Sequence, residues 1–354
     1  MKIHISGRFA HQPMSGVQRY AMEIVRALDA LVADGELPGD FELVTPVETP
    51  DVPLRAIPQV RHGTLPGHVW EQVSFARHAS GGVALSLAMS GPVFHPRHVC
   101  VIHDAAIYRY PEHFSKPYVA AHSLIERMLA RRATIATVSE FSRGELAECL
   151  KLPRERIVVA PNSADHLDAS PDFSIIERLG LGTAPFFLTI GNLTRNKNLK
   201  VAVEALAQVP GDARLVVVGR IDQGVFATNV PEASSRVILA GRLSDEEVTA
   251  LMRHARALVF PSLYEGFGIP PLEAMFNGCP VLASTAPAVQ EVCADAAGYF
   301  APHDAAALAA LMRDVLADGG AWRAAMLEAG KRRVAQYHWS DSARIIAAAC
   351  EALG

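Results

Sequence analysis

Cysteine is scarce in this sequence, and its spacing suggests neither a disulfide framework nor a zinc site. The five cysteines are odd in number and widely separated, and no two form a C-x-x-C pair. Disulfide-rich secreted domains and cysteine-ligated zinc sites need closely spaced, paired cysteines. The opening residues MKIHISG do not resemble a signal peptide, because His4 and Ser6 interrupt the apolar run. We therefore expect reduced thiols in a cytoplasmic protein.

An excess of positive charge and long apolar runs are also missing. The formal net charge is −4 at pH 7, whereas nucleic-acid-binding domains usually carry a basic surface. No apolar run approaches the roughly 18 residues of a membrane-spanning helix. Arg127, Arg131 and Arg132 interrupt a helical pattern, which fits a solvated face or a peripheral contact with a membrane. Nucleic acid is thus excluded as a partner, and any membrane contact is expected to be peripheral.

Two common phosphate-binding signatures are absent. The chain has no GxxxxGK[ST] loop, and Gly266 and Gly268 form a lone GxG without the third glycine of a dinucleotide fingerprint. The histidines between residues 95 and 113 match no zinc signature. These absences count against a P-loop enzyme and a nicotinamide-dependent oxidoreductase, and we expect no bound metal.

Short apolar runs, each followed by a helical pattern, are what the sequence has in abundance. Continuous apolar strands indicate a sheet covered on both faces, and their alternation with helices indicates parallel βαβ units. The predicted strands are KIHIS, FELVTPV, VCVIHDA, TIATVS and RIVVAPN in the first half, and FFLTIGN, RLVVVGR, RVILAGR, ALVFPS, PVLAS and GYFAP in the second. The predicted fold class is therefore α/β, with doubly wound sheets.

A length of 354 residues favours two domains. The polar stretch NSADHLDASPDF, residues 162–173, follows a strand and suits a boundary. We predict an N-terminal domain over residues 1–165 and a C-terminal domain over residues 166–337. The final helical pattern, about residues 338–354, is compatible with packing back on the N-terminal domain.

Polar segments follow several predicted strands, where parallel sheets bind ligands. Ser15 and Gly16 precede a helix with apolar residues at helical spacing and suit a cap and a close-approach turn. His103 and Asp104 end one strand, where such a pair binds hydroxyl groups or acts as a base. Lys197 and Arg195 follow another strand and are placed to neutralise a diphosphate.

The stretch YEGFGIPPLEA sets Glu265 and Glu273 on either side of a Gly- and Pro-rich turn. Prolines suit the first turn of a helix, and Gly278 suits its end. The free amides of such a helix start attract phosphate. We expect Glu273 in the first helical turn, where a carboxylate is also favourable on purely structural grounds. The two carboxylates fit either acid/base work on a glycosidic bond or the binding of ligand hydroxyls beside a phosphate.

The segment from residue 236 to residue 284 resembles the nucleotide-sugar segment of the retaining glycosyltransferases of family 4. Glu265 and Glu273 have that family's E-x7-E spacing, and SGVQRY, VIHDAA, TVSEFS and GNLTRNKN match further landmarks. The resemblance implies the GT-B fold, two doubly wound Rossmann-like domains facing a central cleft. Two departures stand out: Arg195 lies one position from the family's usual second cation, and Ser163 replaces a common glycine.

The resemblance implies a role for each matching residue, and it favours hydroxyl binding over a hydrolase pair. It implies that Glu265 contacts the transferred sugar, that Glu273 holds the ribose and that Lys197 pairs with the diphosphate. The implied catalytic residues are Glu265, His103 and Lys197. The implied donor-binding residues are Gly16, Arg195, Lys197, Arg242, Leu243, Glu265, Gly266, Phe267, Gly268, Ile269 and Glu273. The implied acceptor-binding residues are His103 and Asp104.

The activity implied by this resemblance is transfer of a hexose, mannose or rhamnose-like, from a nucleoside diphosphate sugar such as GDP-mannose. The implied acceptor is a hydroxyl of a glycan or lipid-linked saccharide in bacterial polysaccharide biosynthesis, with retention and without metal or other cofactor. The implied location is the cytoplasm or the inner membrane face. The alternatives are an NAD-dependent oxidoreductase, a sugar-nucleotide epimerase of related architecture and an inactive binding relative.

Overall fold

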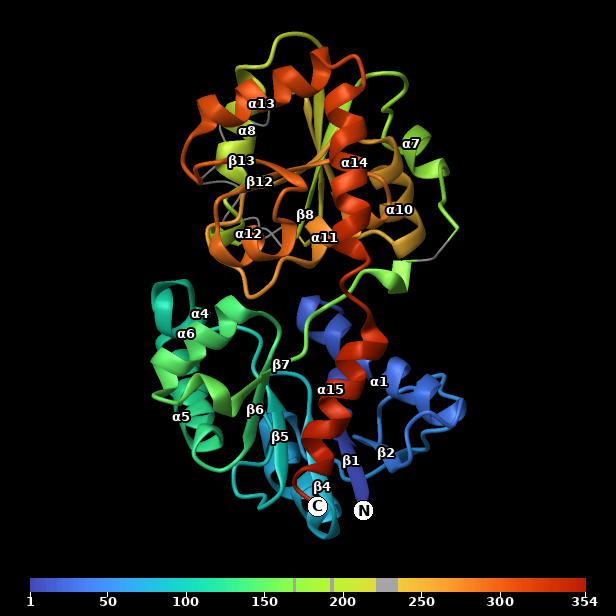
Figure 1. Ribbon diagram of the computed structural model, residues 1–354, viewed down its shortest axis with the longest axis vertical. Coiled ribbons are helices and arrows are strands. Elements are labelled where there is room, and N and C mark those ends of the chain that lie inside the picture. The colour runs from blue at the N-terminus through green and yellow to red at the C-terminus, as the bar shows by residue number, and fades with distance from the viewer. Residues whose placement is uncertain (168–169, 192–193, 221–234) are drawn as a thin grey trace. The chain divides into compact units, whose positions relative to one another are not determined.

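Two parallel β-sheets form the cores of two separate domains in a computed structural model of the chain (Figure 1). The structure describes residues 1–167, 170–191, 194–220 and 235–354. One unit comprises Met1–Asn162 with His338–Gly354, and the other comprises Ser163–Tyr337. The first unit thus ends at Asn162 rather than at residue 165. Asp168 and Ala169 of the predicted boundary stretch lie outside the described residues.

The N-terminal domain has a seven-stranded sheet in the order β3-β2-β1-β4-β5-β6-β7, and its paired strands are parallel. Its strands are β1 (Lys2–Ser6), β2 (Asp40–Thr45), β3 (Gln59–Arg61), β4 (Val83–Ser86), β5 (His98–Val101), β6 (Thr134–Thr137) and β7 (Ile157–Val159). The apolar pattern predicted all of these except β3 and β4. Every residue of β4 and β5 is buried, as expected for strands covered on both faces.

Helices flank this sheet on both sides (Figure 1). They are α1 (Gly16–Ala33), α2 (Gly67–Trp70), α3 (Ala76–His78), α4 (Ala106–Arg109), α5 (Lys116–Ala130), α6 (Glu140–Leu150) and α15 (Trp339–Glu351). Helix α1 buries Tyr20, Ile24 and Leu28 completely, which is the predicted apolar face. Ser15 occupies the N-cap position, but its hydroxyl donates to Gln18 Oε1 rather than capping the helix, so the predicted cap is wrong.

Single turns of other helix types connect these elements. Residues Glu71–Phe75 form one π-helical turn, η2. The 3-10 turns are η1 (Arg8–His11), η3 (Ala79–Gly81), η4 (Pro111–His113), η5 (Arg154–Arg156), η6 (Asp165–Leu167) and η7 (Arg195–Lys197). The turns η1 and η7 precede the helices α1 and α8 in the chain.

The C-terminal domain has a six-stranded parallel sheet in the order β10-β9-β8-β11-β12-β13. The strands are β8 (Phe186–Ile190), β9 (Arg214–Val218), β10 (Val237–Gly241), β11 (Leu258–Phe260), β12 (Val281–Ser284) and β13 (Ala297–Phe300). All six were predicted. The helices are α7 (Ser174–Arg178), α8 (Leu199–Ala207), α10 (Asp245–His254), α11 (Ile269–Phe276), α12 (Pro287–Cys293), α13 (Ala305–Ala317) and α14 (Ala321–Val334).

Neighbouring residues of one strand enter two different cores in the C-terminal domain. Phe187 packs in one apolar cluster and Leu188 in the other, and Val217 and Val216 divide in the same way. Successive side chains of a strand point to opposite faces, so each face of this sheet carries its own core. This explains why the strands read as continuous apolar runs.

Helix α15 completes the N-terminal domain, where it lies against α1 (Figure 1). Trp339 is 5% exposed, and its ring meets Tyr20 of α1 edge to face at 5.8 Å. The Ser342 hydroxyl donates to the Pro161 carbonyl at 2.7 Å, and Arg344 pairs with Glu36 at 2.6 Å. The last helix of the chain therefore belongs to the core of the first domain.

None of the helices in the described residues combines the length and apolar character that a membrane-spanning segment needs. All five cysteines are free thiols, and Cys149 is the one that is partly exposed.

Replacing Trp339 with Ala should destabilise the N-terminal domain by about 3–5 kcal/mol, because it opens a large cavity between α15 and α1. Trp339→Phe keeps most of the ring contact with Tyr20 and serves as the matched control. Urea unfolding followed by circular dichroism measures both variants. Equal stability of the two variants would show that the ring of residue 339 contributes little to the packing of α15.

Candidate functional site

Lys197 and Glu265 form an ion pair at the carboxyl end of the C-terminal sheet. Lys197 Nζ lies 2.5 Å from Glu265 Oε1, and the two side chains are 24% and 14% exposed. The ammonium also lies 5.5 Å from the centre of the Phe260 ring, a cation–π distance. Two residues predicted to act together, one after β8 and one after β11, are thus in direct contact.

A small hollow with a volume of about 10 Å³ opens beside this ion pair. It is lined by Thr189, Ile190, Gly191, Lys197, Leu199, Phe260, Pro261 and Ser262. The Ser262 hydroxyl is buried and has no hydrogen-bond partner within the described residues. An ammonium and an unpaired hydroxyl in one hollow suit a polar, negatively charged ligand. Asn192 and Leu193 of the predicted loop lie outside the described residues.

Helix α11 begins at Ile269 behind a glycine in a left-handed conformation. Gly268 has φ +107°, a value that residues with a Cβ rarely adopt. Pro270 and Pro271 occupy the first turn, as predicted. Phe267 is buried, and its ring meets Tyr337 edge to face at 5.4 Å. This stretch therefore presents backbone amides, rather than the Phe267 side chain, to a ligand.

Glu273 lies in the second turn of α11, so its predicted place in the first turn is wrong. It is the fifth residue of the helix, and the first turn contains no acidic residue. The favourable interaction of a carboxylate with the first turn of a helix therefore does not explain Glu273. Its Oε1 instead lies 3.2 Å from Nε2 of His166, whose side chain is 2% exposed. Sequence reasoning missed His166, although it stands in the quoted stretch NSADHLD.

The two glutamates have different basic partners, Lys197 for Glu265 and His166 for Glu273. A glycosidase pair acts on one bond from opposite sides, with one carboxyl group kept protonated. Here each carboxylate contacts a side chain of its own, Lys197 for Glu265 and His166 for Glu273. This arrangement supports hydroxyl binding over acid/base hydrolysis.

Three further predicted donor-binding residues of this domain are Arg195, Arg242 and Leu243. Arg195 in η7 and Arg242 after β10 are exposed, and Leu243 packs against the apolar core beside α10. Within the described part of the chain, neither arginine shares a hydrogen bond or ion pair with either glutamate. The structure therefore brings Lys197 to Glu265 and leaves Arg195 and Arg242 at the surface.

Asn198 fixes the loop that carries Lys197, and sequence reasoning gave it no role. Its backbone is left-handed, with φ 50°. Its side-chain amide donates to the carbonyls of Pro261, at 3.1 Å, and Pro302, at 2.6 Å. These bonds join the start of α8 to the segments that follow β11 and β13. An Asn before a helical run suggests a cap, but this side chain reaches across the sheet edge instead.

Asn198→Ala should lower stability by about 1–3 kcal/mol, because it leaves two carbonyls without their donor. It should also weaken the nucleotide binding that the sequence predicts, since the Lys197 loop loses its anchor. Urea unfolding and calorimetric titration with GDP measure the two effects. Gln208→Ala, which removes a side-chain amide bonded to a carbonyl of its own helix at the surface, is the control. A variant with unchanged stability and nucleotide affinity would contradict the anchoring role.

His103 is buried at the carboxyl end of β5 in the N-terminal domain. Its Nε2–H donates to the Leu87 carbonyl at 3.0 Å, so the ring lone pair is on Nδ1. The ring also meets Tyr20 edge to face at 4.8 Å. Burial lowers the pKa of His103 to about 4, although the bond to Leu87 opposes this shift. A neutral imidazole with so low a pKa accepts a hydroxyl hydrogen bond but is a weak base, which favours the binding role.

The other predicted N-terminal residues lie at helix starts. Asp104 accepts a hydrogen bond from the Ala106 amide at 2.8 Å and so helps to begin α4. Gly16 is the exposed first residue of α1. Both lie after strands of the N-terminal sheet, β5 and β1 respectively, as expected for ligand-binding loops.

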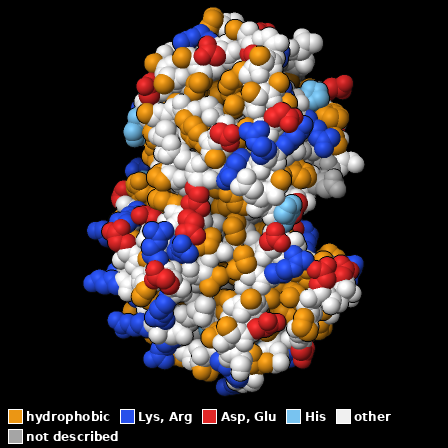
Figure 2. Space-filling model, viewed as in Figure 1, with side chains coloured by type: hydrophobic (Ala, Val, Ile, Leu, Met, Phe, Trp, Pro, Cys, Tyr) orange, Lys and Arg blue, Asp and Glu red, His pale blue; other side chains and the backbone are white. Residues whose placement is uncertain are grey.

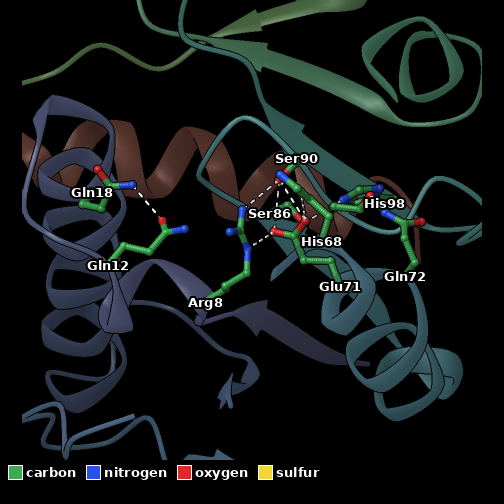
Figure 3. A network of polar contacts seen from close by, with 10 residues as sticks. Arg8, Gln12, Gln18, His68, Glu71, Gln72, Ser86, Ser90 and His98 are labelled. Carbon is green, nitrogen blue, oxygen red and sulfur yellow. Dashed lines mark hydrogen bonds and ion pairs between the residues drawn. The ribbon is translucent and has the colours of Figure 1, made fainter. Parts of the chain in front are cut away.

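A polar network that the sequence did not reveal lies at the same sheet edge (Figure 3). Arg8, just after β1, donates to Glu71 Oε1 at 2.7 Å, and His68 Nδ1 lies 2.9 Å from Glu71 Oε2. The Ser90 hydroxyl donates to the same carboxylate. Burial would raise the pKa of Glu71, but the interactions with His68 and Arg8 outweigh it and lower the pKa. The segments SGRF and GHVWEQ contain Arg8, His68 and Glu71, but no spacing rule connects positions so far apart.

Glu126 of α5 is a buried acid close to this edge. Both of its oxygens are shielded from solvent, and its carboxyl group interacts with the Tyr108 hydroxyl. Burial, opposed by the hydrogen bond with Tyr108 and aided by the negative charge of Asp104, raises the pKa of Glu126 to about 8. The carboxyl group is therefore mostly protonated at neutral pH.

Glu126→Gln should make the protein more stable than wild type at pH 8, with the difference shrinking toward pH 5. The folded-state pKa lies above the unfolded value near 4.3, so the wild type loses stability as pH rises between these values. Urea unfolding at several pH values measures this. Glu155→Gln, at an exposed glutamate, provides the control. A pH-independent difference between Glu126→Gln and wild type would refute the raised pKa.

Comparison with known proteins defines the class of this chain. Residues 173–333 match a family described as glycosyl transferases group 1, and residues 14–166 match glycosyltransferase family 4. The O-antigen chain mannosyltransferase B of Escherichia coli is 30% identical over 269 residues, covering 71% of this chain and 70% of that protein. The chain belongs to the family 4 glycosyltransferases of the GT-B fold, which confirms the predicted family.

Two further relatives match this chain over only part of their own length. The serotype-specific mannosyltransferase WbdA of Escherichia coli is 26% identical over 70% of this chain, which spans 32% of that protein. The O-antigen chain mannosyltransferase RfbU of Salmonella typhimurium is 29% identical over 57% of this chain and 56% of its own.

Solved structures confirm the predicted fold. WaaG, a glycosyltransferase involved in lipopolysaccharide biosynthesis, has a TM-score of 0.73 at 18% identity, with 98% of both chains covered. Anabaena HepE in complex with UDP and glucose has a TM-score of 0.77 at 17% identity, with 99% of this chain and all of that chain covered.

Proposed function

We propose that this protein is a retaining hexosyltransferase of bacterial polysaccharide biosynthesis. It moves mannose, or a rhamnose-like sugar, from a nucleoside diphosphate donor, with GDP-mannose favoured, to a hydroxyl of a glycan or lipid-linked acceptor. The observation that carries this choice of sugar is the likeness to O-antigen mannosyltransferases along most of the chain. The oxidoreductase and epimerase alternatives find no support among these relatives.

The donor is proposed to bind at the start of α11. Its diphosphate meets the free amides around Gly268 and Ile269 and the ammonium of Lys197. Because Lys197 is paired with Glu265 in the free protein, the diphosphate competes with Glu265 for the same cation. The released carboxylate then accepts hydrogen bonds from the sugar hydroxyls. Glu273, beside His166, holds the ribose hydroxyls.

The proposed chemistry places the new bond on the same face of the sugar as the old one. As the bond between the sugar and the diphosphate breaks, the acceptor hydroxyl attacks, and its proton passes to the departing phosphate oxygen. Lys197 stabilises the negative charge that develops on the diphosphate. A cation supplied by the protein makes a metal ion unnecessary, so the proposal is metal-independent.

The acceptor is proposed to bind at the strand ends of the N-terminal domain. Nδ1 of His103 accepts a hydrogen bond from an acceptor hydroxyl, and Asp104 offers a partly exposed carboxylate. The Arg8–Glu71–His68 network adds polar groups suited to saccharide hydroxyls. The backbone of Gly16, which carries no side chain, allows close approach of a phosphate.

A peripheral membrane contact is part of this proposal. Arg127, Arg131 and Arg132 are exposed on α5 and the turn after it. Figure 2 shows basic side chains, interspersed with acidic ones, on the side of the N-terminal domain that carries α5 and α6. Such a surface suits the anionic inner face of a bacterial membrane, where a lipid-linked acceptor would be presented.

Glu265→Ala should reduce the transfer rate by about 10²–10³-fold or more without unfolding the protein, because it removes the proposed sugar contact. Transfer is measured with radiolabelled GDP-mannose and a lipid-linked saccharide, and the anomeric configuration of the product by NMR. Glu177→Ala, at an exposed glutamate of the same domain, is the control.

Wild-type turnover by Glu265→Ala would remove the assigned role of Glu265. An inverted product would refute retention. Thermal-shift measurements with GDP, UDP, dTDP and ADP test the base, since a ligand at 100 times its Kd adds about 2.7 kcal/mol. Stabilisation by UDP alone would overturn the choice of GDP.

A further inference from the structure

A cluster of two histidines and one glutamate lies outside the proposed sugar-transfer residues. His4 is in the middle of β1, Glu42 is its direct neighbour on β2, and His78 is at the end of α3. His4 Nδ1 lies 2.7 Å from Glu42 Oε1, and His78 Nε2 lies 2.5 Å from the same oxygen. Nitrogen and oxygen atoms of all three side chains lie within 4.8 Å of one another. Three groups that bind metals thus converge on one point.

The surroundings make room for this cluster and orient it. A Cβ at Gly82 would lie 2.5 Å from His4 Nε2, so a glycine is required beside the imidazole. Lys2 Nζ lies 2.7 Å from Glu42 Oε2, which leaves Oε1 to face the two histidines. The ring of His62 lies 5.0 Å from that of His78 and offers another imidazole.

Burial and hydrogen bonding act together on His4 and Glu42. Burial lowers the pKa of His4 below its ordinary value, although Glu42 opposes the shift. Burial would raise the pKa of Glu42, but hydrogen bonds from Lys2, His4 and His78 outweigh it and bring the pKa to about 2.

We propose that His4, Glu42 and His78 bind one divalent transition-metal ion of the zinc class. Two imidazole nitrogens and one carboxylate oxygen form a known ligand set for zinc, with a fourth position for His62 or water. The ion takes the place of the hydrogen atoms that now lie between the histidines and Oε1, and each neutral ring moves its proton to its other nitrogen. Lys2 stays on Oε2 and holds the carboxylate in position, as groups around metal ligands commonly do.

The role of this ion is structural. It joins β1, β2 and α3 in the body of the N-terminal domain, whereas the proposed acceptor residues lie in the loops after the strands. The proposal is independent of sugar transfer and is compatible with a metal-independent reaction. The alternative is a metal-free network in which Glu42 is balanced by Lys2 and the two histidines.

The test uses the full chain without a histidine tag, treated with EDTA and then dialysed. Titration with Zn²⁺ by calorimetry should show one saturable equivalent and should raise the melting temperature. Titration with Co²⁺ should produce the visible absorption of a four-coordinate ion at the same stoichiometry. His78→Gln and Glu42→Gln should each weaken binding by more than the roughly 10–100-fold that loss of an outer partner costs.

His254→Ala, which removes an exposed histidine of the other domain, is the control and should bind one equivalent with wild-type affinity. Absence of saturable binding by the wild-type chain would overturn the proposal and leave the metal-free network. Unchanged affinity in His78→Gln would also overturn it. If Glu42→Gln does not fold, the wild-type cobalt spectrum and the partly exposed His78 position still decide the question.

Discussion

Parallel strand order is the constraint on which the rest of this structure depends. In a parallel sheet every strand ends at the same edge, so residues far apart in the chain meet there. Lys197 and Glu265, which follow β8 and β11, are 2.5 Å apart for this reason. In the other domain Arg8, just after β1, pairs with Glu71 of the π-helical turn η2. The sheets that position these residues are stable because apolar side chains cover both of their faces.

The sequence predicted the strands well where the apolar run was long. It failed at β3, a short strand at the sheet edge, and at β4, whose four residues follow two glycines. Both are recognised only by their pairing with neighbours, which a local pattern does not contain. The predicted place of Glu273 in the first turn of α11 was also wrong. Gly268 starts the helix earlier than the proline pair alone suggests, and this moves the glutamate into the second turn.

The sequence predicted the type of candidate site but only some of the residues that form it. Residue types and spacing identified Lys197 and Glu265, whereas His166 and Asn198 act through contacts between distant segments that no spacing encodes. The chemical role of His103 also could not be predicted from the sequence alone. Whether it is a base or a hydrogen-bond acceptor depends on its burial and on the carbonyl of Leu87, and both are properties of the folded domain.

The return of α15 to the first domain affects how the protein is made. The polypeptide leaves the N-terminal domain after Asn162 and re-enters it at His338. A ribosome has therefore synthesised the whole C-terminal domain before the N-terminal core can close. Until then the surface of α1 that Trp339 covers stays open to water or to a chaperone. The second domain to emerge is thus the first that can finish folding.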